Sequence, residues 1–348
     1  MPRVVSFSHL PAHLNTGLSI NRDELVMVAV AGQIAHPVAG AAPYRIGNDG
    51  VPRVLPSTGG IVLNHRIGDR CVGLAGDHIE PGVALHNNGR EVTGPRNGPN
   101  NALITYACVG NLAEVMTGRC RGARGLVTGK HGGVNHVLVD FPLEILAGLD
   151  IGNRIKIYSY GLGLAITGAP DVTVLNCAPS LLANWAVRIR DHALEVRVTH
   201  IVPGRVMGSG LGKNTAWRGD CDMQLFDAGT RRRHGLDTLR FGDLVAIRDA
   251  DMRHGPSYRH GWLTVGIVVH GDSTVSGHGP GVTALLTGPR SAFRVIRDQN
   301  ANLAALYRVR QPVSPRAYQP LAHRPGPSWR GAPDRSIAGR SPRKHVLQ

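Results

Sequence analysis

Short apolar runs rich in β-branched residues recur along the chain, each bounded by glycine, proline, asparagine or aspartate. Runs of this length and composition predict strands, because β-branched side chains fit a pleated surface and the bounding residues favour turns. The strands predicted in this way cover residues 25–30, 113–116, 125–128, 136–141, 154–158, 194–198, 244–247 and 265–269. The protein is therefore predicted to be mostly β.

Helical patterns are few. The segment that begins at Pro142 has proline in its first turn and Gly148 near its end, which is typical of a short helix. Two further segments, which begin at Pro179 and Asp298, carry apolar residues at three- and four-residue spacing and are also predicted to be helical. The basic run at 231–235 lies outside these patterns and is predicted to be a solvated loop.

A turn motif repeats along the chain: an apolar residue, a glycine, and then an acid or amide immediately before a strand. It begins at Ile67, Ile151 and Phe241. Glycine beside aspartate or asparagine supplies the positive-φ turn that starts a hairpin strand, and repeated turns of this kind suggest barrel-like or sandwich-like domains. We therefore predict a β-rich α+β fold with two such β domains and a few helices.

The chain has 348 residues, which is enough for two domains that each bury a core. The predicted organisation is a loose leader at 1–20, an N-terminal β-rich domain at 21–192, a C-terminal β-rich domain at 193–310 and a tail at 311–348. The tail combines seven prolines with glycine, serine and arginine and has no apolar period. It is therefore predicted to be disordered and basic.

The net charge is +15, but it is concentrated near the C-terminus. Twelve lysines and arginines and only two acidic residues follow residue 288, so the predicted folded body is only mildly basic. Aromatic residues make up 5% of the chain, which argues against the stacking platforms that single-stranded nucleic acids need. Nucleic-acid binding by the folded body is therefore not expected, apart from one segment.

That segment is residues 117–141, which is similar to the KOW-type loop and strand of small SH3-like barrels that bind RNA or protein. Its basic residues Arg119, Arg121, Arg124 and Lys130 would suit phosphates. RNA binding through this segment stays open as an alternative.

Membrane insertion and secretion are not expected. No stretch has the roughly 18 apolar residues of a membrane helix, and the first residues lack the pattern of a secretory signal. The five cysteines are far apart and odd in number, which suggests reduced thiols rather than disulfides or a zinc–cysteine site. A cytoplasmic protein is expected.

Candidate chemistry lies in four glycine-rich loops that carry acids and histidines. The candidates are, loop by loop, Asp77, His78 and Glu80; Lys130, His131 and His136; His200 and Ser209, followed by Asp220 and Asp222; and Asp272 and His278. On a strand, residues two apart point the same way, so His78 and Glu80, or Asp220 and Asp222 with Cys221 turned away, could share a metal ion or a proton. The alternative is that these acids simply cap turns.

Two of the histidines, His131 in GKHGG and His278 in GHGPG, lie in glycine-rich turns. Consecutive amides in such turns bind anions, and neutral imidazole is a common metal ligand, although a histidine can also simply satisfy a loop carbonyl. The sequence around Ser209 lacks both the phosphate-loop spacing and the nucleophile-elbow pattern. Nucleotide hydrolysis is therefore excluded, and a serine hydrolase is disfavoured.

Five motifs together carry a family resemblance: LPSTGGI, GDHIEPGV, TGKHGGVNHVLVDF, VTHIVPGRVMGSGLG and GHGPGV. They resemble the bacterial and archaeal proteins grouped as domain of unknown function 4438, from near Asn21 to near Leu306. The resemblance implies a β-rich, two-part fold and a homo-oligomer, but no activity. Ala84 and Cys221 stand where a serine and an aromatic residue are expected, which suggests altered substrate contacts. The leader, the tail and the arginine-rich stretch near Arg232 lie outside the resemblance.

These observations lead to one functional hypothesis, a metal-assisted hydrolase of a small polar or cyclic substrate, with a C–N bond as the expected target. The expected ligands of its divalent metal ion are among His78, Glu80, His200, Asp220, Asp222 and His278. The ion would activate water or polarise a carbonyl, with Asp77 or Asp272 as general base. Further catalytic candidates are His131 and Lys130, and the substrate and oxyanion candidates are Gly132, Gly133, Ser209 and Gly210.

Two further alternatives stay open beside RNA binding. One is a metal-free lyase or isomerase that uses the same acids and histidines. The other is a ring-forming protein whose glycine loops bind a small metabolite or contact neighbouring subunits.

Overall fold

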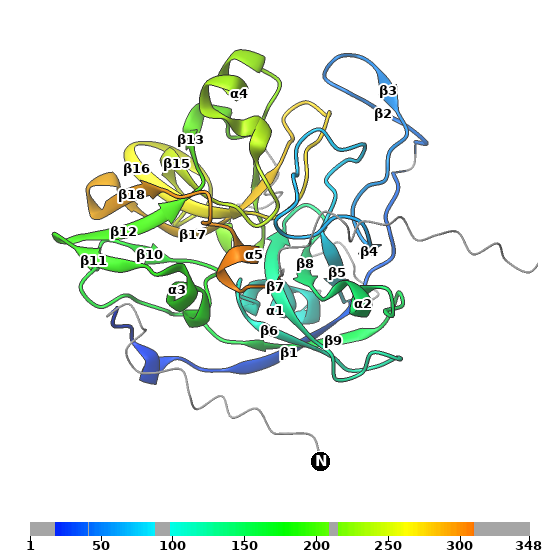
Figure 1. The fold of residues 1–348 in the computed structure, drawn as a ribbon, viewed down its shortest axis with the longest axis horizontal. Coiled ribbons are helices and arrows are strands. Elements are labelled where there is room, and N and C mark those ends of the chain that lie inside the picture. The colour runs from blue at the N-terminus through cyan, green and yellow to red at the C-terminus, as the bar shows by residue number, and fades with distance from the viewer. Residues whose placement is uncertain (1–17, 41, 88–97, 209–214, 310–348) are drawn as a thin grey trace, which may run out of the picture. The chain divides into compact units, whose positions relative to one another are not determined.

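A computed structural model gives the fold of residues 18–40, 42–87, 98–208 and 215–309. Strands dominate it, which confirms the predicted β-rich class (Figure 1). The predicted tail and all but the last residues of the predicted leader lie outside the described residues.

Six strands of the N-terminal half form a closed barrel. They are β1 (Val28–Ile34), β5 (Gly82–His86), β6 (Leu112–Val115), β7 (Arg124–His131), β8 (His136–Asp140) and β9 (Arg154–Ser159). The order is β1-β9-β6-β7-β8-β5, and the pairing of Gln33 in β1 with His86 in β5 closes the ring. Closure leaves no free edges among these six strands. The short strand β4 (Ile61–Val62) adds to β5.

The C-terminal half is built on a second sheet. Its strands are β10 (Thr173–Val174), β13 (His200–Pro203), β14 (Cys221–Asp222), β15 (Leu244–Asp251), β16 (Ser257–Val268) and β17 (Gly281–Pro289). The order is β10-β17-β16-β15-β13, with β14 also paired to β17. A three-stranded sheet of β11 (Arg188–Arg190), β12 (Ala193–Val198) and β18 (Phe293–Arg297) and a hairpin of β2 (Arg45–Ile46) and β3 (Pro52–Arg53) complete the strands.

The two halves share a hydrophobic core. Ala84 and Leu138 of the barrel belong to the same buried cluster as Val265 and Leu285 of the second sheet. All but the last residue of β17 are buried, so side chains cover both of its faces. Loops from the two halves meet beside this shared core. The predicted domain boundary at residues 192 and 193 stays a prediction.

Three of the five α-helices in the described residues occur where they were predicted. These are α2 (Leu143–Leu146), α3 (Pro179–Trp185) and α5 (Leu303–Leu306), and the others are α1 (Gly98–Tyr106) and α4 (Ala228–His234). The helical pattern after Pro179 stops early, because Ala186 adopts a left-handed φ of 56° and the following residues form β11. Short 3-10 turns lie at Arg22–Glu24, Gly204–Val206, Ala216–Arg218, Leu236–Thr238 and Arg290–Ala292.

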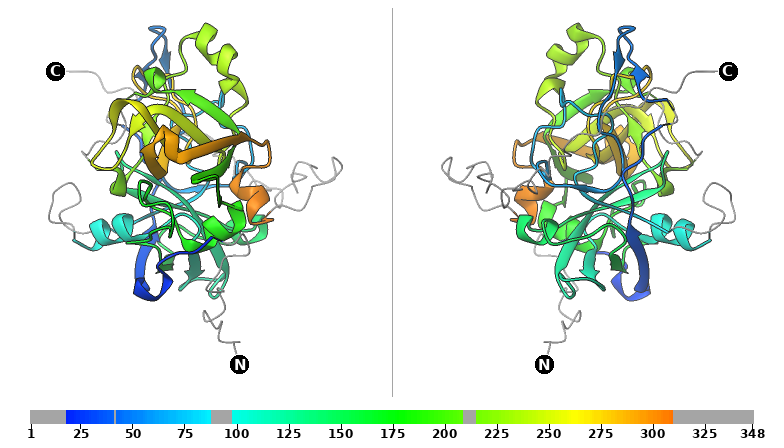
Figure 2. Two further views of the ribbon diagram at one scale, coloured as in Figure 1. Left: turned by 90° about the vertical axis from the view of Figure 1, so that its left-hand side faces the viewer. Right: turned by 90° about the vertical axis from the view of Figure 1, so that its right-hand side faces the viewer.

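The predicted loop at 231–235 is wrong, because most of this basic run lies in helix α4. The side chain of Asp227 caps the helix by accepting hydrogen bonds from the amides of Gly229 and Thr230. The basic residues fall in the last turn, where they complement the helix dipole, and Gly235 ends the helix in a left-handed conformation. Helix α4 and the β2–β3 hairpin lie at the end of the described region that is opposite β1 (Figure 2).

The five cysteines form no disulfide. None of the helices in the described ranges is long and apolar enough to cross a membrane.

Gly82 gives a test of the barrel. Its φ of 76° lies in the left-handed region that disfavours other residues, and a Cβ there would clash with the carbonyl oxygen of Val139 in β8. We expect Gly82→Ala to lower the free energy of unfolding by about 3 kcal/mol, through backbone strain plus the clash. Gly152→Ala is the control, because Gly152 has a similar φ with open space around it, and should cost about 1 kcal/mol. Urea unfolding measures both, and equal losses would contradict the close β5–β8 packing.

Candidate metal centre

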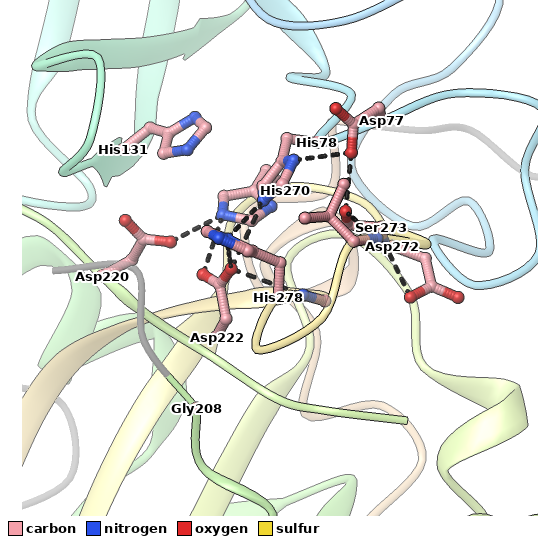
Figure 3. Close-up of polar contacts among 12 residues, drawn as sticks. Asp77, His78, His131, Gly208, Asp220, Asp222, His270, Asp272, Ser273 and His278 are labelled. Carbon is pink, nitrogen blue, oxygen red and sulfur yellow. Dashed lines mark hydrogen bonds and ion pairs between the residues drawn. The ribbon is translucent and has the colours of Figure 1, made fainter. Parts of the chain in front are cut away.

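Four histidines and two aspartates from separate segments meet where loops of the two halves face each other (Figure 3). His78 lies in the loop before β5, and His131 is the last residue of β7. Asp220 lies just before β14 and Asp222 at its end, and His270 and His278 lie in the loop between β16 and β17. These six side chains fall into two groups whose ligand atoms lie within 4.8 Å of one another.

The first group contains His78, Asp222 and His278. The Oδ2 atom of Asp222 is 3.0 Å from Nδ1 of His278 and 3.4 Å from Nε2 of His78. The same two imidazole nitrogens are 3.2 Å apart. Three atoms with lone pairs or exchangeable protons therefore surround one small volume, as metal ligands do.

The second group contains His131, Asp220 and His270 and is more deeply buried. Nε2 of His270 lies 2.7 Å from Oδ2 of Asp220, at ion-pair distance, and neither atom has another hydrogen-bond partner among the described residues. Unpaired buried polar atoms are costly and rare in proteins. Two of them side by side, both of ligand type, indicate a site built for a third group.

The two groups adjoin each other. The ring centroids of His131 and His270 are 4.2 Å apart, and those of His78 and His270 are 5.0 Å apart. Asp222 spans both groups, because its Oδ1 lies 3.5 Å from Nε2 of His270 while its Oδ2 faces His78 and His278.

Outer hydrogen bonds orient three of the four imidazole rings. Nδ1 of His78 donates to Asp77 (2.9 Å), and Nδ1 of His131 donates to Glu80 (2.7 Å), because an ionised carboxylate can only accept. Nδ1 of His270 donates to the carbonyl oxygen of Gly271 (3.0 Å). In each neutral ring Nε2 then carries the lone pair that a metal ion needs, and carboxylate–histidine pairs of this kind are typical of metal sites.

The backbone around the cluster is shaped to hold it. Asp220 and Asp222 project to the cluster while Cys221 between them packs in a hydrophobic cluster, which is the alternation of an extended chain. The amide of Gly132 donates to Oδ1 of Asp220 (2.7 Å). His78 adopts a left-handed φ of 56°, a strained conformation that often marks functional positions.

Gly281 in β17 lies against the second group. A Cβ at this position would clash with Oδ2 of Asp220 and Nε2 of His270. The absence of a side chain at Gly281 therefore lets these two atoms lie against strand β17.

The carboxylates and imidazoles shift each other's pKa values. Burial alone would raise the pKa of Asp222, but contacts with His270, His278 and His78 outweigh it and lower that pKa. Burial alone would lower the pKa of His270, but Asp220 and Asp222 outweigh it and raise that pKa well above its ordinary value. The site therefore attracts positive charge, in the form of either protons or metal cations.

The structure brings seven of the predicted site residues together. Four of the predicted metal ligands, His78, Asp220, Asp222 and His278, and the predicted catalytic residue His131 offer ligand atoms to the two groups. Glu80 and Asp77 belong to neither group, but each hydrogen-bonds to a histidine of one group. Glu80 accepts hydrogen bonds from His131 and His136 and from the amide of Gly59. Asp77 accepts from His78, from Ser273 and from Arg45, and these bonds lower its pKa to about 2 against the opposing effect of burial.

Other predicted residues do not join the two groups. His200 is buried in β13, where its ring contacts the hydroxyl groups of Thr199 and Thr238. The carboxylate of Asp272 accepts hydrogen bonds from the amides of Ser273 and Gly73, and burial raises its pKa. Figure 3 shows this carboxylate pointing away from the histidines.

The predicted oxyanion site is not assembled as expected. The amide of Gly132 is occupied by Asp220, so it orients a ligand instead of facing a substrate. Gly133 lies exposed at the turn between β7 and β8. Ser209 and Gly210 lie outside the described residues.

Lys130 is fully buried on the opposite face of β7 from His131. Its Nζ donates to the carbonyl oxygens of Thr105 (3.1 Å) and Trp217 (2.9 Å) and to Oδ1 of Asn176 (2.7 Å). Burial lowers its pKa to about 7. Its three donors thus tie together segments of both halves, which is a structural arrangement rather than the predicted catalytic one.

Sequence reasoning missed His270. It lies directly after the predicted strand that ends at Val269 and two residues before Asp272. Its position at the end of a buried strand, next to a glycine and an acid, was the available signal.

Comparisons with known proteins support the fold. The sequence pattern described as "Domain of unknown function (DUF4438), N-terminal" matches residues 44–183, and that of the corresponding C-terminal domain matches residues 184–307. A solved structure described as "Crystal structure of TM1086" is 39% identical in sequence, with a TM-score of 0.75. The similarity covers 81% of this chain and 96% of that one. No curated protein matches the chain.

The role of Lys130 is testable. We expect Lys130→Met to lower the free energy of unfolding by about 3 kcal/mol or more, because three buried acceptors lose their donor. Metal content of the folded variant should stay at the wild-type level, since Lys130 faces away from the histidines. Lys156→Met, at a nearly unburied lysine, is the control and should change stability little. Wild-type stability in Lys130→Met would contradict the structural role.

Proposed function

The chain belongs to the family described as domain of unknown function DUF4438, and because that description names no reaction, we propose from the side chains that the protein is a metal-dependent hydrolase. The observation that carries the proposal is the buried cluster of four imidazoles and two carboxylates, in which Asp77, Glu80 and the carbonyl oxygen of Gly271 fix the outer nitrogens of three rings. Such outer bonds hold ligands in place for an ion.

The donor set favours hydrolytic over redox or thiolate chemistry. Imidazole and carboxylate ligands suit zinc, manganese, iron or cobalt. No cysteine belongs to either group of ligand atoms in the described ranges, and Cys221 is buried among apolar side chains. A bound divalent ion would polarise a substrate carbonyl or lower the pKa of a water molecule.

The chain's own residues divide the remaining roles. The low pKa of Asp77 and its bond to His78 suit an orienting carboxylate rather than a base. Burial raises the pKa of Asp272, but its carboxylate is held by the amides of Ser273 and Gly73 and points away from the histidines, so this arrangement does not favour it as the general base. A small polar or cyclic substrate with a scissile C–N bond, a homo-oligomeric state and a cytoplasmic location stay predictions.

The RNA-binding alternative loses one of its phosphate contacts. Lys130 is fully buried and hydrogen-bonded inside the protein, so it cannot reach a phosphate in this fold. The metal-free lyase or isomerase uses the same side chains, and metal analysis separates it from the hydrolase.

Elemental mass spectrometry of the purified, untagged protein is the direct test. We expect a bound divalent metal, and we expect His131→Ala to lose metal together with hydrolysis in a screen of amides and lactams, because a ligand is removed. His200→Ala is the matched control, since His200 is also a buried histidine but belongs to neither group. Folded wild-type protein that binds no zinc, manganese, iron or cobalt would overturn the proposal.

Glu80 gives a second test. Glu80→Gln leaves the two groups of ligand atoms intact but weakens the hydrogen bonds that orient His131 and His136, so metal affinity should fall about 10- to 100-fold. Titration with Zn²⁺ measures this change. Glu195→Gln is the control, because Glu195 is equally buried but pairs with Arg188 and Arg294. An unchanged affinity in Glu80→Gln would show that Glu80 has no positioning role.

A further inference from the structure

We infer that the cluster holds two metal ions that exchange unequally: an inner ion at His131, Asp220 and His270, and an outer ion at His78, Asp222 and His278. The inference rests on the proposed metal-dependent function and deepens it. It assigns the slowly exchanging ion to the inner group of side chains and the readily exchanging ion to the outer group.

The number and arrangement of the ligands favour two ions. Six side chains offer ligand atoms in two groups of three, whereas a catalytic zinc ion typically takes three protein ligands and leaves one position open. Asp222 directs one oxygen to His270 and the other to His78 and His278. A carboxylate placed in this way suits a bridge between neighbouring ions, and paired ions are common in hydrolases.

The buried charge also favours more than one ion. Four carboxylates lie buried in or beside the cluster, namely Asp77, Glu80, Asp220 and Asp222. The pair of Asp77 with Arg45 is the only ion pair that any of them forms with an arginine or lysine in the described parts of the chain. Unpaired buried charges are strongly unfavourable. One divalent cation would offset only part of the remaining negative charge.

The two positions differ in their access to solvent. The side chains of Asp220 and His270 have no exposed surface, and His131 is nearly as buried. The side chain of His278, by contrast, is 34% exposed. An ion on the His278 side would therefore lie near solvent and substrate, whereas an inner ion would be enclosed by buried side chains.

Gly281 lets the inner ligands lie directly against strand β17. A Cβ at this position would clash with both Asp220 Oδ2 and His270 Nε2, which lie 2.7 Å apart and have no other hydrogen-bond partner among the described residues. The placement of these two ligand atoms therefore depends on the lack of a side chain at residue 281.

Zn²⁺ is the probe for the experiment. Full-length protein, freed of metal and then reloaded with Zn²⁺, should bind two ions per chain by elemental analysis. Release of zinc to a colorimetric chelator should occur in two separate phases. His278→Ala should bind only one ion, and its release should match the slow phase of the wild type.

Gly281→Ala tests the inner position. It should lose the slowly released ion, because the added methyl group displaces the inner ligands. Gly133→Ala is the control, since a Cβ at Gly133 meets no atom within 4 Å, and it should keep both ions. Circular dichroism checks the fold of each variant, and His278→Gln replaces His278→Ala if the latter does not fold.

The outcomes separate this inference from the proposed function. One ion per chain with hydrolytic activity would overturn the two-ion inference but leave the hydrolase standing. Two ions released in a single phase, or loss of the slow ion in His278→Ala, would overturn the assignment of inner and outer positions. A folded wild-type protein that binds no ion would overturn both proposals.

Discussion

The architecture depends on burying carboxylates against imidazole rings where the two halves of the fold meet. Isolated buried carboxylates are strongly unfavourable, so each must have a partner. Glu80 is matched by His131 and His136 and Asp77 by His78, while Asp220 and Asp222 face His270. Further contacts of the cluster, between His78 and Asp222 and between the amide of Gly132 and Asp220, connect the barrel to the second sheet. The position of each ring therefore depends on both halves, and neither half alone contains the whole cluster.

Strand β7 shows how the scaffold and the cluster are coupled. Successive residues of a strand point to opposite faces, and β7 uses both faces at its end. Lys130 donates hydrogen bonds to Trp217 and Asn176, and its backbone contacts the hydroxyl group of Thr283 in β17. The next residue, His131, enters the cluster. Lys130 thus fixes the strand against the C-terminal half, and His131, on the other face, is held in the cluster as a result.

Much of the fold could be predicted from the sequence, because local pattern determines most of its strands. The runs at 113–116, 136–141, 154–158 and 194–198 correspond closely to β6, β8, β9 and β12. Strand β5 was not predicted, because Gly82–His86 is short and carries one β-branched residue, and its place between β8 and β1 comes from long-range pairing. Helix α4 was also not predicted, although the cap at Asp227 is a local signal.

The sequence predicts the residue types of the candidate site, but not which individual histidines belong to it. Histidines and acids in glycine-rich loops pointed to His78, Asp222 and His278, which the structure brings together, because such loops collect at strand ends. The same criterion chose His200, whose ring contacts Thr199 and Thr238 instead, and it passed over His270. No local pattern distinguishes these two buried histidines. Their difference lies in which strands pair: β14 joins β17 and brings Asp220 to His270, whereas β13 pairs with β15 and leaves His200 away from both groups. The cluster is therefore a product of sheet topology, and the pairing of the strands decides which histidines enter it.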